Sequence, residues 1–222
     1  MEGETGTSIA DRVHRRLHRR LVFDRRRDRL AAALVAALPD ESSHVLDIGC
    51  GSGEIGSDLE DAGHRVIGVE VLARETCAIP FARFDGRRLP FPDGAFDDAV
   101  IVDVLHHTAD PTAVLAEARR VTTGSVVLKD HFAESGRARF TLGVMDWVGN
   151  RQFGVGRDGA YLSRAQWDDV FDAAGLAVGD LSESLDLYPT PAKPFFENGL
   201  HFVARLVGRA LSAGDDAADV SS

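Results

Sequence analysis

The apolar positions of the chain change their period several times between Pro39 and Leu206. Short apolar runs typical of strands alternate with stretches in which apolar residues recur every three or four positions, as in amphipathic helices. This alternation predicts an α/β fold: a doubly wound, Rossmann-like, seven-stranded and mostly parallel sheet with an antiparallel last strand and helices on both faces. The predicted strands are residues 44–48, 65–69, 79–84, 96–102, 125–128, 176–185 and 201–206, and the predicted helices between them are 54–62, 111–121 and 164–174.

Helix-capping residues mark where two of these helices begin. Asp110 precedes Pro111 and suits an N-cap with proline at the first helical position. Ser163 and Gln166 have the spacing of a capping box. These signals fix the helix starts more firmly than periodicity alone.

Three regions surround or interrupt the alternating core, which we place at residues 41–211. Residues 1–40 form an Arg-rich helical region, with nine arginines between Arg12 and Arg29. These arginines could be a solvated basic face, or a patch that meets an anionic substrate, a phospholipid surface or an acidic partner. Residues 132–162 form a lid-like insert that contains Trp147 and Phe153, although packing of a cap helix would explain its apolar residues equally well. The acidic tail, residues 212–222, is expected to be disordered.

Composition narrows the class of protein further. The net charge of -10 at pH 7 argues against general nucleic-acid binding. The surface is rich in Asp and poor in Lys, which both high intracellular salt and a GC-rich genome would favour. The two cysteines, Cys50 and Cys77, predict neither a disulfide framework nor a metal site. We find no membrane-span pattern and no signal peptide, so we expect a cytoplasmic protein of undetermined oligomeric state.

Three glycines follow the first predicted strand, at Gly49, Gly51 and Gly53. Glycines between a strand and a helix of a doubly wound sheet let a ligand approach the backbone closely. A dinucleotide fingerprint would need its last glycine where this chain has Glu54, whose carboxylate would repel a pyrophosphate. No Lys-Ser/Thr pair follows, which excludes a phosphate-binding P-loop. The loop therefore disfavours a dinucleotide and excludes a P-loop nucleotide.

Three segments in the same order resemble a known enzyme family. Residues 45–53, VLDIGCGSG, resemble the first motif of class I S-adenosylmethionine-dependent methyltransferases. Residues 66–70, VIGVE, resemble the second-strand motif of the same family. Residues 84–121 resemble the middle of the type 11 methyltransferase domain. The likeness covers residues 44–131, and the turn at residues 122–124 departs from the usual Gly-Gly. It implies S-adenosylmethionine as cofactor and methyl transfer as the activity.

The resemblance also implies which residues bind the cofactor. Glu70 is expected to accept hydrogen bonds from the ribose hydroxyls, Asp85 from the adenine amino group, and Asp103 to lie near the methionyl portion. Asp47 is expected to order the glycine loop. The full expected set is Asp47, Gly49, Cys50, Gly51, Gly53, Glu70, Val71, Asp85, Gly86 and Asp103.

Candidate catalytic residues follow the fourth and fifth predicted strands. A methyl acceptor whose nucleophile carries a proton needs a base, and the candidates are His106, His107, Asp130 and His131. A structural hydrogen-bonding role for His106 and His107, and a structural ion pair between Lys129 and Asp130, remain alternatives. We expect only one of the two adjacent histidines to face the pocket.

The leading hypothesis is therefore a methyltransferase that acts on a small-molecule acceptor, with a lipid or isoprenoid-like acceptor left open. The alternative from another class is a non-catalytic module that binds S-adenosylmethionine and regulates a partner. A nicotinamide-dependent oxidoreductase is disfavoured by Glu54. Nucleic-acid methylation is disfavoured by the acidic charge and by the lack of an N/D-P-P-Y/F motif.

Overall fold

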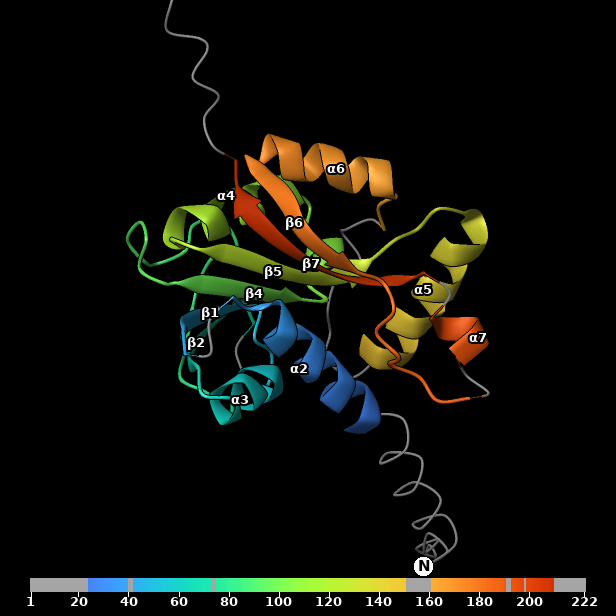
Figure 1. Cartoon of the computed structure of the whole chain (residues 1–222), viewed down its shortest axis with the longest axis horizontal. Helices are drawn as coiled ribbons and strands as arrows, with labels where there is room; N and C mark the ends of the chain where they lie inside the picture. The colour runs from blue at the N-terminus through green and yellow to red at the C-terminus, as the bar shows by residue number, and fades with distance from the viewer. Residues whose placement is uncertain are drawn as a thin grey trace, which may run out of the picture.

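The computed structural model describes residues 24–39, 42–72, 75–150, 161–190, 193–197 and 199–209 (Figure 1). Most of the predicted Arg-rich region, part of the predicted lid and the predicted acidic tail lie outside the described residues. Within the described part, no helix is long and apolar enough to cross a membrane.

One seven-stranded sheet forms the centre of the molecule, with strand order β3-β2-β1-β4-β5-β7-β6. β7 pairs antiparallel with both β5 and β6, and the other pairs are parallel. The predicted fold class is confirmed. The strands are β1 (His44–Ile48), β2 (Arg65–Glu70), β3 (Phe81–Arg83), β4 (Asp98–Val102), β5 (Ser125–His131), β6 (Leu176–Ser182) and β7 (His201–Gly208).

Helices cover both faces of this sheet, as Figure 1 shows. On one face, Leu34 of α2 and Leu59 of α3 pack with Val45 and Val127. On the other face, helices α4 and α6 pack against alternate residues of the same strands in a second apolar cluster. The helices are α2 (Arg25–Ala37), α3 (Glu54–Asp61), α4 (Pro111–Val121), α5 (Gly136–Asn150), α6 (Arg164–Ala173) and α7 (Lys193–Phe196), with a 3-10 turn η2 (Leu105–His107).

Both predicted helix starts are confirmed by their caps. The Asp110 carboxylate accepts a hydrogen bond from the Ala113 N–H at 3.0 Å, with Pro111 as the first residue of α4. Ser163 and Gln166 make both hydrogen bonds of the capping box at the start of α6. Each cap satisfies backbone donors that the first helical turn leaves unpaired.

Several strand boundaries differ from the prediction. β5 extends three residues further than expected, because β7 pairs with it as far as His131, opposite His201. This antiparallel partner supplies backbone hydrogen bonds, so polar residues can continue a strand that periodicity ends early. β3 is shorter than predicted at both ends, β4 begins at Asp98 rather than at residue 96, and β6 ends at Ser182 rather than at residue 185.

Candidate active site

The glycine loop connects β1 to α3 at the carboxyl edge of the sheet. Gly49, Gly51 and Gly53 all have positive φ angles, of 79°, 56° and 76°. A Cβ added to Gly53 would lie 2.7 Å from the Cys77 sulfur, so the packing of the protein itself requires glycine there. A Cβ added to Gly51 would meet nothing within 4 Å. The loop is therefore tightly packed at Gly53 and open at Gly51, where a ligand has room to approach.

Glu70 ends β2 and holds this loop in place. Its Oε2 accepts a hydrogen bond from the Gly51 N–H at 3.0 Å, and its Oε1 accepts from the N–H groups of Val71 at 2.8 Å and Leu72 at 3.0 Å. Each carboxylate oxygen has two lone pairs, so the Val71 and Leu72 N–H groups already use both lone pairs of Oε1. Three backbone N–H groups therefore fix the Glu70 carboxylate beside the glycine loop.

Asp47 lies beneath the loop on β1 and is only 2% exposed. Burial, and then the nearby Glu70 carboxylate, raise the pKa of Asp47 to about 7. Its Oδ2 is buried without a hydrogen-bond partner among the described residues. A buried acceptor of this kind fits a ligand that brings a donor or a positive charge.

Cys50 is buried, whereas Asp85 in the segment after β3 is exposed. The Cys50 sulfur is directed toward β2, since a Cβ on Gly68 would come within 2.5 Å of it. Asp85 is exposed, and its Oδ1 accepts from the N–H groups of Arg88 and Arg87, which lower the pKa of Asp85. A Cβ on Gly86 would lie 3.3 Å from Val71, so these two residues are neighbours at the same rim. Apart from Asp103, the predicted cofactor residues thus lie at or just after the carboxyl ends of β1, β2 and β3.

Asp103 follows β4 in a left-handed conformation with φ of 55° and joins two cations. Its Oδ1 bonds to the Lys129 ammonium, and its Oδ2 accepts a hydrogen bond from Arg26 Nη2 at 2.9 Å. Its Oδ1 is also 3.7 Å from His131 Nε2. The alternative of a Lys129–Asp130 ion pair is thus replaced by a Lys129–Asp103 pair, because β5 directs Lys129 toward the end of β4.

Burial and these contacts act together on the pKa values of the cluster. Burial would raise the pKa of Asp103, but Lys129, His131 and Arg26 hold it well below its usual range. Burial lowers the pKa of Lys129 despite Asp103, and burial together with Lys129 lowers that of His131. Asp103 is therefore a carboxylate at neutral pH, and His131 is neutral.

Asp130 is fully buried and joins the candidate histidines. Its Oδ1 lies 2.7 Å from His106 Nδ1 and 3.2 Å from His131 Nδ1, and accepts a hydrogen bond from the His131 N–H at 2.9 Å. Burial would raise the pKa of Asp130, but His106 and His131 lower it. The ring of His107 lies 4.0 Å from that of His106. His106 thus contacts both this carboxylate and the ring of its neighbour in the sequence.

The structure adds four residues that the sequence analysis did not single out. Arg26 reaches the cluster from α2 and also contacts Tyr188. The ring of Tyr161 stacks on His106 at 5.4 Å, and the ring of His201 lies 4.8 Å from that of His131. Arg26 precedes the buried Leu30 by four positions, and that spacing was the one available signal that it points inward.

A comparison with known families agrees with this geometry. Residues 19–181, about three quarters of the chain, match the model of a family described as "Methyltransferase domain". The chain belongs to this methyltransferase family. The fold is the class I methyltransferase fold, as the sequence resemblance predicted.

Curated relatives match the methyltransferase over part of their length. An uncharacterized methyltransferase of Mycobacterium leprae is 40% identical over 95 residues, which cover 38% of this chain and 35% of the relative. The demethylmenaquinone methyltransferase of Beutenbergia cavernae is 33% identical over 109 residues, 46% of this chain and 45% of the relative. The 18S rRNA (guanine-N(7))-methyltransferase of Bos taurus is 32% identical over 83 residues, 34% of this chain and 30% of the relative. The chain spans less than half the length of these relatives.

Solved structures share the fold of the methyltransferase over nearly all of the chain. A chain from the complex of the Haloferax volcanii Trm112 methyltransferase activator with its methyltransferase has a TM-score of 0.63 at 21% identity, covering 90% of this chain and 96% of that one. Magnesium protoporphyrin IX methyltransferase from Synechocystis, solved with bound SAH, has a TM-score of 0.56 at 17% identity, covering 94% and 90%. At these identities the likeness concerns the fold.

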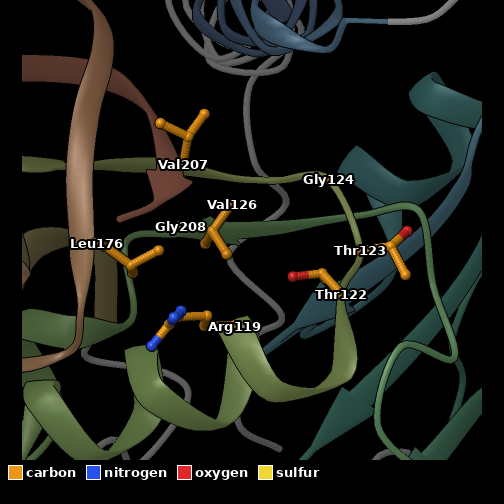
Figure 2. A pocket seen from close by; sticks show the side chains of 8 residues that line it. All are labelled: Arg119, Thr122, Thr123, Gly124, Val126, Leu176, Val207 and Gly208. Atoms are coloured by element: carbon orange, nitrogen blue, oxygen red, sulfur yellow. The ribbon is translucent and has the colours of Figure 1, made fainter. Parts of the chain in front are cut away.

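A cavity of about 460 Å³ lies away from the predicted site residues (Figure 2). It is lined by Arg119 and Thr122 at the end of α4, by Val126 of β5 and by Leu176 and Val207 of β6 and β7. These residues mark the opposite edge of the sheet, where the parallel strands begin. None of the predicted site residues lines this cavity, so we do not assign the cofactor to it.

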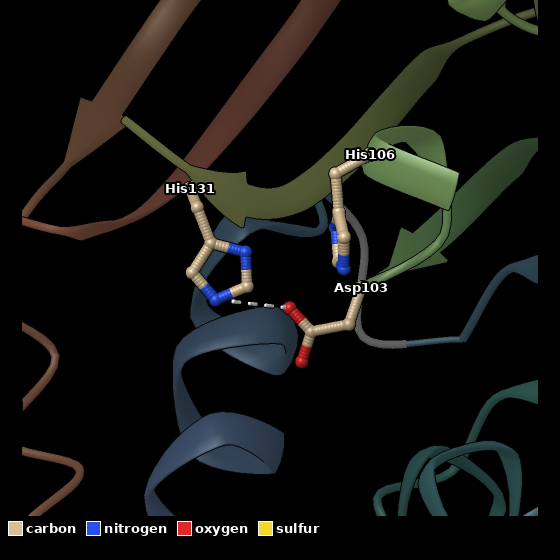
Figure 3. Close-up of side chains that lie close together, drawn as sticks. All are labelled: Asp103, His106 and His131. Carbon is tan, nitrogen blue, oxygen red and sulfur yellow. Dashed lines mark ion pairs between the residues drawn. The ribbon is translucent and has the colours of Figure 1, made fainter. Parts of the chain in front are cut away.

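Asp103, His106 and His131 could also hold a metal ion, since each offers a ligand atom and these atoms lie within 4.8 Å of one another (Figure 3). Lys129 competes for the same place, because its ammonium bonds to Asp103 Oδ1 and lies 3.4 Å from His131 Nε2. Arg26 adds a second positive charge on Asp103. A divalent ion would have to displace one cation and face the other, so the cluster favours Lys129 as its resident cation.

Proposed function

We propose that the methyltransferase transfers the methyl group of S-adenosylmethionine to a small-molecule acceptor whose nucleophile carries a proton. The observation that carries this proposal is the buried contact of 2.7 Å between His106 Nδ1 and Asp130 Oδ1. A carboxylate on Nδ1 orients the imidazole and stabilises the imidazolium that forms when Nε2 takes a proton. Methyl transfer to a hydroxyl or an amine requires such a proton acceptor.

The cofactor fits the residues at the ends of β1, β2 and β3. It supplies a methyl group on a sulfonium, which is already activated for displacement. We propose that Glu70 binds the ribose hydroxyls, that Val71, Asp85 and Gly86 flank the adenine, and that the open side of Gly51 admits the cofactor. The buried carboxylate of Asp47 and its unpartnered Oδ2 favour a positively charged group nearby.

We propose that Gly49, Gly53 and Cys50 shape this loop, and that Asp103 faces the methionyl end from the tip of β4. Lys129 and Arg26 hold the Asp103 carboxylate in its strained backbone position. Because both carboxylate oxygens are engaged, Asp103 can change its orientation little when the cofactor binds. This preorganisation favours alignment of the methyl group with the acceptor.

Among the candidate bases, we assign proton abstraction to His106. The assignment rests on its buried contact with the Asp130 carboxylate, which fixes the orientation of the imidazole ring. His107 lies beside it, with ring centroids 4.0 Å apart, and serves as the natural comparison. Asp130 and His131 act as positioning residues, since His131 shares the same Asp130 oxygen.

We infer the acceptor class from the net charge and from the relatives named for quinone metabolism. Relatives named for quinone metabolism, including the ubiquinone biosynthesis O-methyltransferase of Cereibacter sphaeroides at 30% identity over 99 residues, support a ring-bearing or isoprenoid-like small molecule. The rRNA methyltransferase relative points elsewhere, but a net charge of -10 opposes RNA, whose binding depends on basic residues. We therefore favour the small molecule.

A membrane surface receives less support from the described arginines of α2. Arg25 lies 2.5 Å from Asp186, Arg29 lies 3.4 Å from Asp186, and Arg27 is bonded to Asp58. Arg25 and Arg29 share the single Asp186 carboxylate, so these pairs reduce but do not cancel the charge that anionic headgroups would attract. The arginines before residue 24 lie outside the described residues, so membrane contact through them stays a prediction.

A screen of hydroxylated and amino metabolites with methyl-labelled S-adenosylmethionine tests this function directly. Once an acceptor is found, His106→Ala is expected to lower kcat by about 10²- to 10⁴-fold, because one general base contributes that much. Affinity for S-adenosylhomocysteine, measured by calorimetry, should stay within about threefold, because His106 does not bind the cofactor. His107→Ala is the matched control and should lower kcat far less.

Two results would contradict the proposal. Equal kcat values for His106→Ala and the unchanged protein would remove His106 as the base. Labelling of rRNA or tRNA with no labelling of any small molecule would remove the proposed acceptor class, while leaving the methyltransferase activity intact.

A further inference from the structure

Helix α5 is apolar on two sides, and the described residues cover one of them. Leu142 is buried in an apolar cluster with Ala133 and Leu200. On the other side, Phe140 is 73% exposed, and Val144, one turn later, is 42% exposed. No other large apolar side chain that the structure describes is as exposed as Phe140. An exposed apolar helix face of this kind indicates a surface that meets a partner.

Two arginines lie beside this exposed face. Arg137 and Arg139 are both exposed, and within the described part of the chain neither side chain makes an ion pair or a hydrogen bond. Because successive residues of a helix are about 100° apart, Arg137 lies on one side of Phe140 and Arg139 on the other. The outer face of α5 consists of Arg137, Arg139, Phe140 and Val144. It has an apolar centre with positive charge on both sides.

An anionic phospholipid bilayer matches this combination. The Phe140 ring can enter the boundary between headgroups and acyl chains, while arginines on long apolar stems keep their guanidinium groups at the phosphates. We propose that the outer face of α5 docks on such a bilayer. A protein partner would also cover the apolar side chains, but two arginines around one aromatic ring favour a layer of phosphate groups.

The net charge of -10 does not prevent this docking. At physiological ionic strength, charges more than about 8 Å from the bilayer are largely screened, so the charges near the contact decide. The sequence of α5 holds two arginines and one acid, Asp146. Glu134, just before α5, lies 3.8 Å from Arg164, which offsets its charge. The local charge at the outer face is therefore positive.

The inner side of α5 borders the proposed base. Tyr161 packs on the same apolar cluster as Leu142, and its ring stacks on His106 at 5.4 Å. In Figure 1, α5 lies beyond the end of β5, the strand that carries Asp130. A bilayer at the outer face thus brings a lipid-soluble acceptor within reach of His106. This consequence rests on the function proposed above, whereas the docking itself does not.

Co-sedimentation of the full chain with vesicles tests the docking. We expect binding to vesicles of equal parts phosphatidylcholine and phosphatidylglycerol, and weaker binding at high salt or with pure phosphatidylcholine. Phe140→Ala should weaken binding to the anionic vesicles about tenfold, because the ring no longer leaves water on docking. Arg137→Gln and Arg139→Gln should each weaken it about fivefold, and only on anionic vesicles.

Two variants elsewhere on the surface are matched controls. Val178→Ala removes a side chain on β6 that is 43% exposed, and Arg65→Gln removes an exposed arginine at the start of β2. Both should bind the anionic vesicles within about twofold of the unchanged protein. Phe140→Ala should keep the melting temperature and the S-adenosylhomocysteine affinity, which shows that only the docking surface has changed.

Three results would overturn the docking proposal. The first is no binding to the anionic vesicles at low salt, and the second is equal binding by Phe140→Ala and the unchanged protein. The third is a dimer in sedimentation velocity that Phe140→Ala makes monomeric, because a second copy of the chain would then cover the outer face. None of these measurements needs cofactor or acceptor, so they leave the proposed methyl transfer untouched.

Activity tests the consequence for the acceptor. With a long-chain acceptor held in anionic vesicles, Phe140→Ala should raise KM about tenfold and leave kcat unchanged. With a water-soluble acceptor of the same ring type, both constants should stay the same. Methylation of water-soluble acceptors alone would overturn the lipid-soluble acceptor, while methylation of none would instead count against the proposed function.

Discussion

Replacement of Asp47 by Asn should stabilise the methyltransferase in a way that depends on pH. In the folded protein, burial and Glu70 raise the pKa of Asp47 from 3.8 to about 7. Between these two pH values the folded state holds a proton that the unfolded state has lost. Unfolding therefore releases a proton, and rising pH favours unfolding across this window.

The size of the effect follows from that pKa difference. Each pH unit in the window costs about 1.4 kcal/mol, so the carboxyl group destabilises the fold by about 1.6 kcal/mol at pH 5 and by about 4 kcal/mol at pH 8. The amide side chain of the Asp47→Asn variant does not titrate. The stability difference between this variant and the unchanged protein should therefore grow by about 2.5 kcal/mol from pH 5 to pH 8.

Urea denaturation at both pH values, without cofactor, measures this difference. Any fixed cost of burying the amide is the same at both pH values and cancels. In thermal melts the same change amounts to about 5–10 °C for a chain of this size. Asp98 on the neighbouring strand β4 gives a control of opposite sign, because its Oδ1 accepts from both the N–H and the hydroxyl of Ser125. Asp98→Asn should destabilise the protein.

The reasoning would be refuted by an Asp47→Asn stability difference that is equal at pH 5 and pH 8. That result would mean that Asp47 ionises alike in the folded and unfolded states, despite being 2% exposed. We also expect the stabilised variant to lose cofactor affinity, because the charge that destabilises the empty fold is the one proposed to favour a cationic ligand.

Four further substitutions test separate parts of the structure. Gly51→Ala should lower the free energy of unfolding by only about 1 kcal/mol, and it should weaken S-adenosylhomocysteine binding. Gly53→Ala should lower the free energy of unfolding by about 3 kcal/mol, because an added Cβ would contact Cys77 closely. Equal losses of stability for the two variants would contradict this expectation. Lys129→Met should destabilise the fold by about 1–3 kcal/mol, because Asp103 loses one of its two cations. If urea denaturation shows a more stable variant, the cost of burying the ammonium exceeds the stabilisation from its ion pair with Asp103. Asp110→Ala should lower the free energy of unfolding by about 1 kcal/mol, because α4 loses its N-cap. An unchanged melting temperature would mean that this cap does not stabilise the protein.

The fold class and the position of the glycine loop could be predicted because local patterns encode them. Apolar runs at residues 44–48 and 65–69 are buried on both faces, and such runs form central parallel strands. Glu70 ends its strand as expected, next to the glycine loop. These features depend on neighbours in the sequence and on a topology that alternating elements nearly always adopt.

The end of β5 could not be predicted from its own residues. The sequence pattern predicts that the strand ends at residue 128, before three polar residues. The structure instead continues β5 through all three, and they are buried: Lys129, Asp130 and His131. Their strand conformation depends on β7, about seventy positions later, which supplies the antiparallel hydrogen bonds. A local pattern contains no information about such a partner.

The sequence by itself determined the class of fold, the methyl donor and the set of candidate residues, because periodicity and motif spacing act over short distances. Only the tertiary structure decided which charges meet. Asp103 pairs with Lys129 and with Arg26, a residue 77 positions away. Such contacts depend on how separate elements cross at one edge of the sheet, where burial makes each charge require a partner.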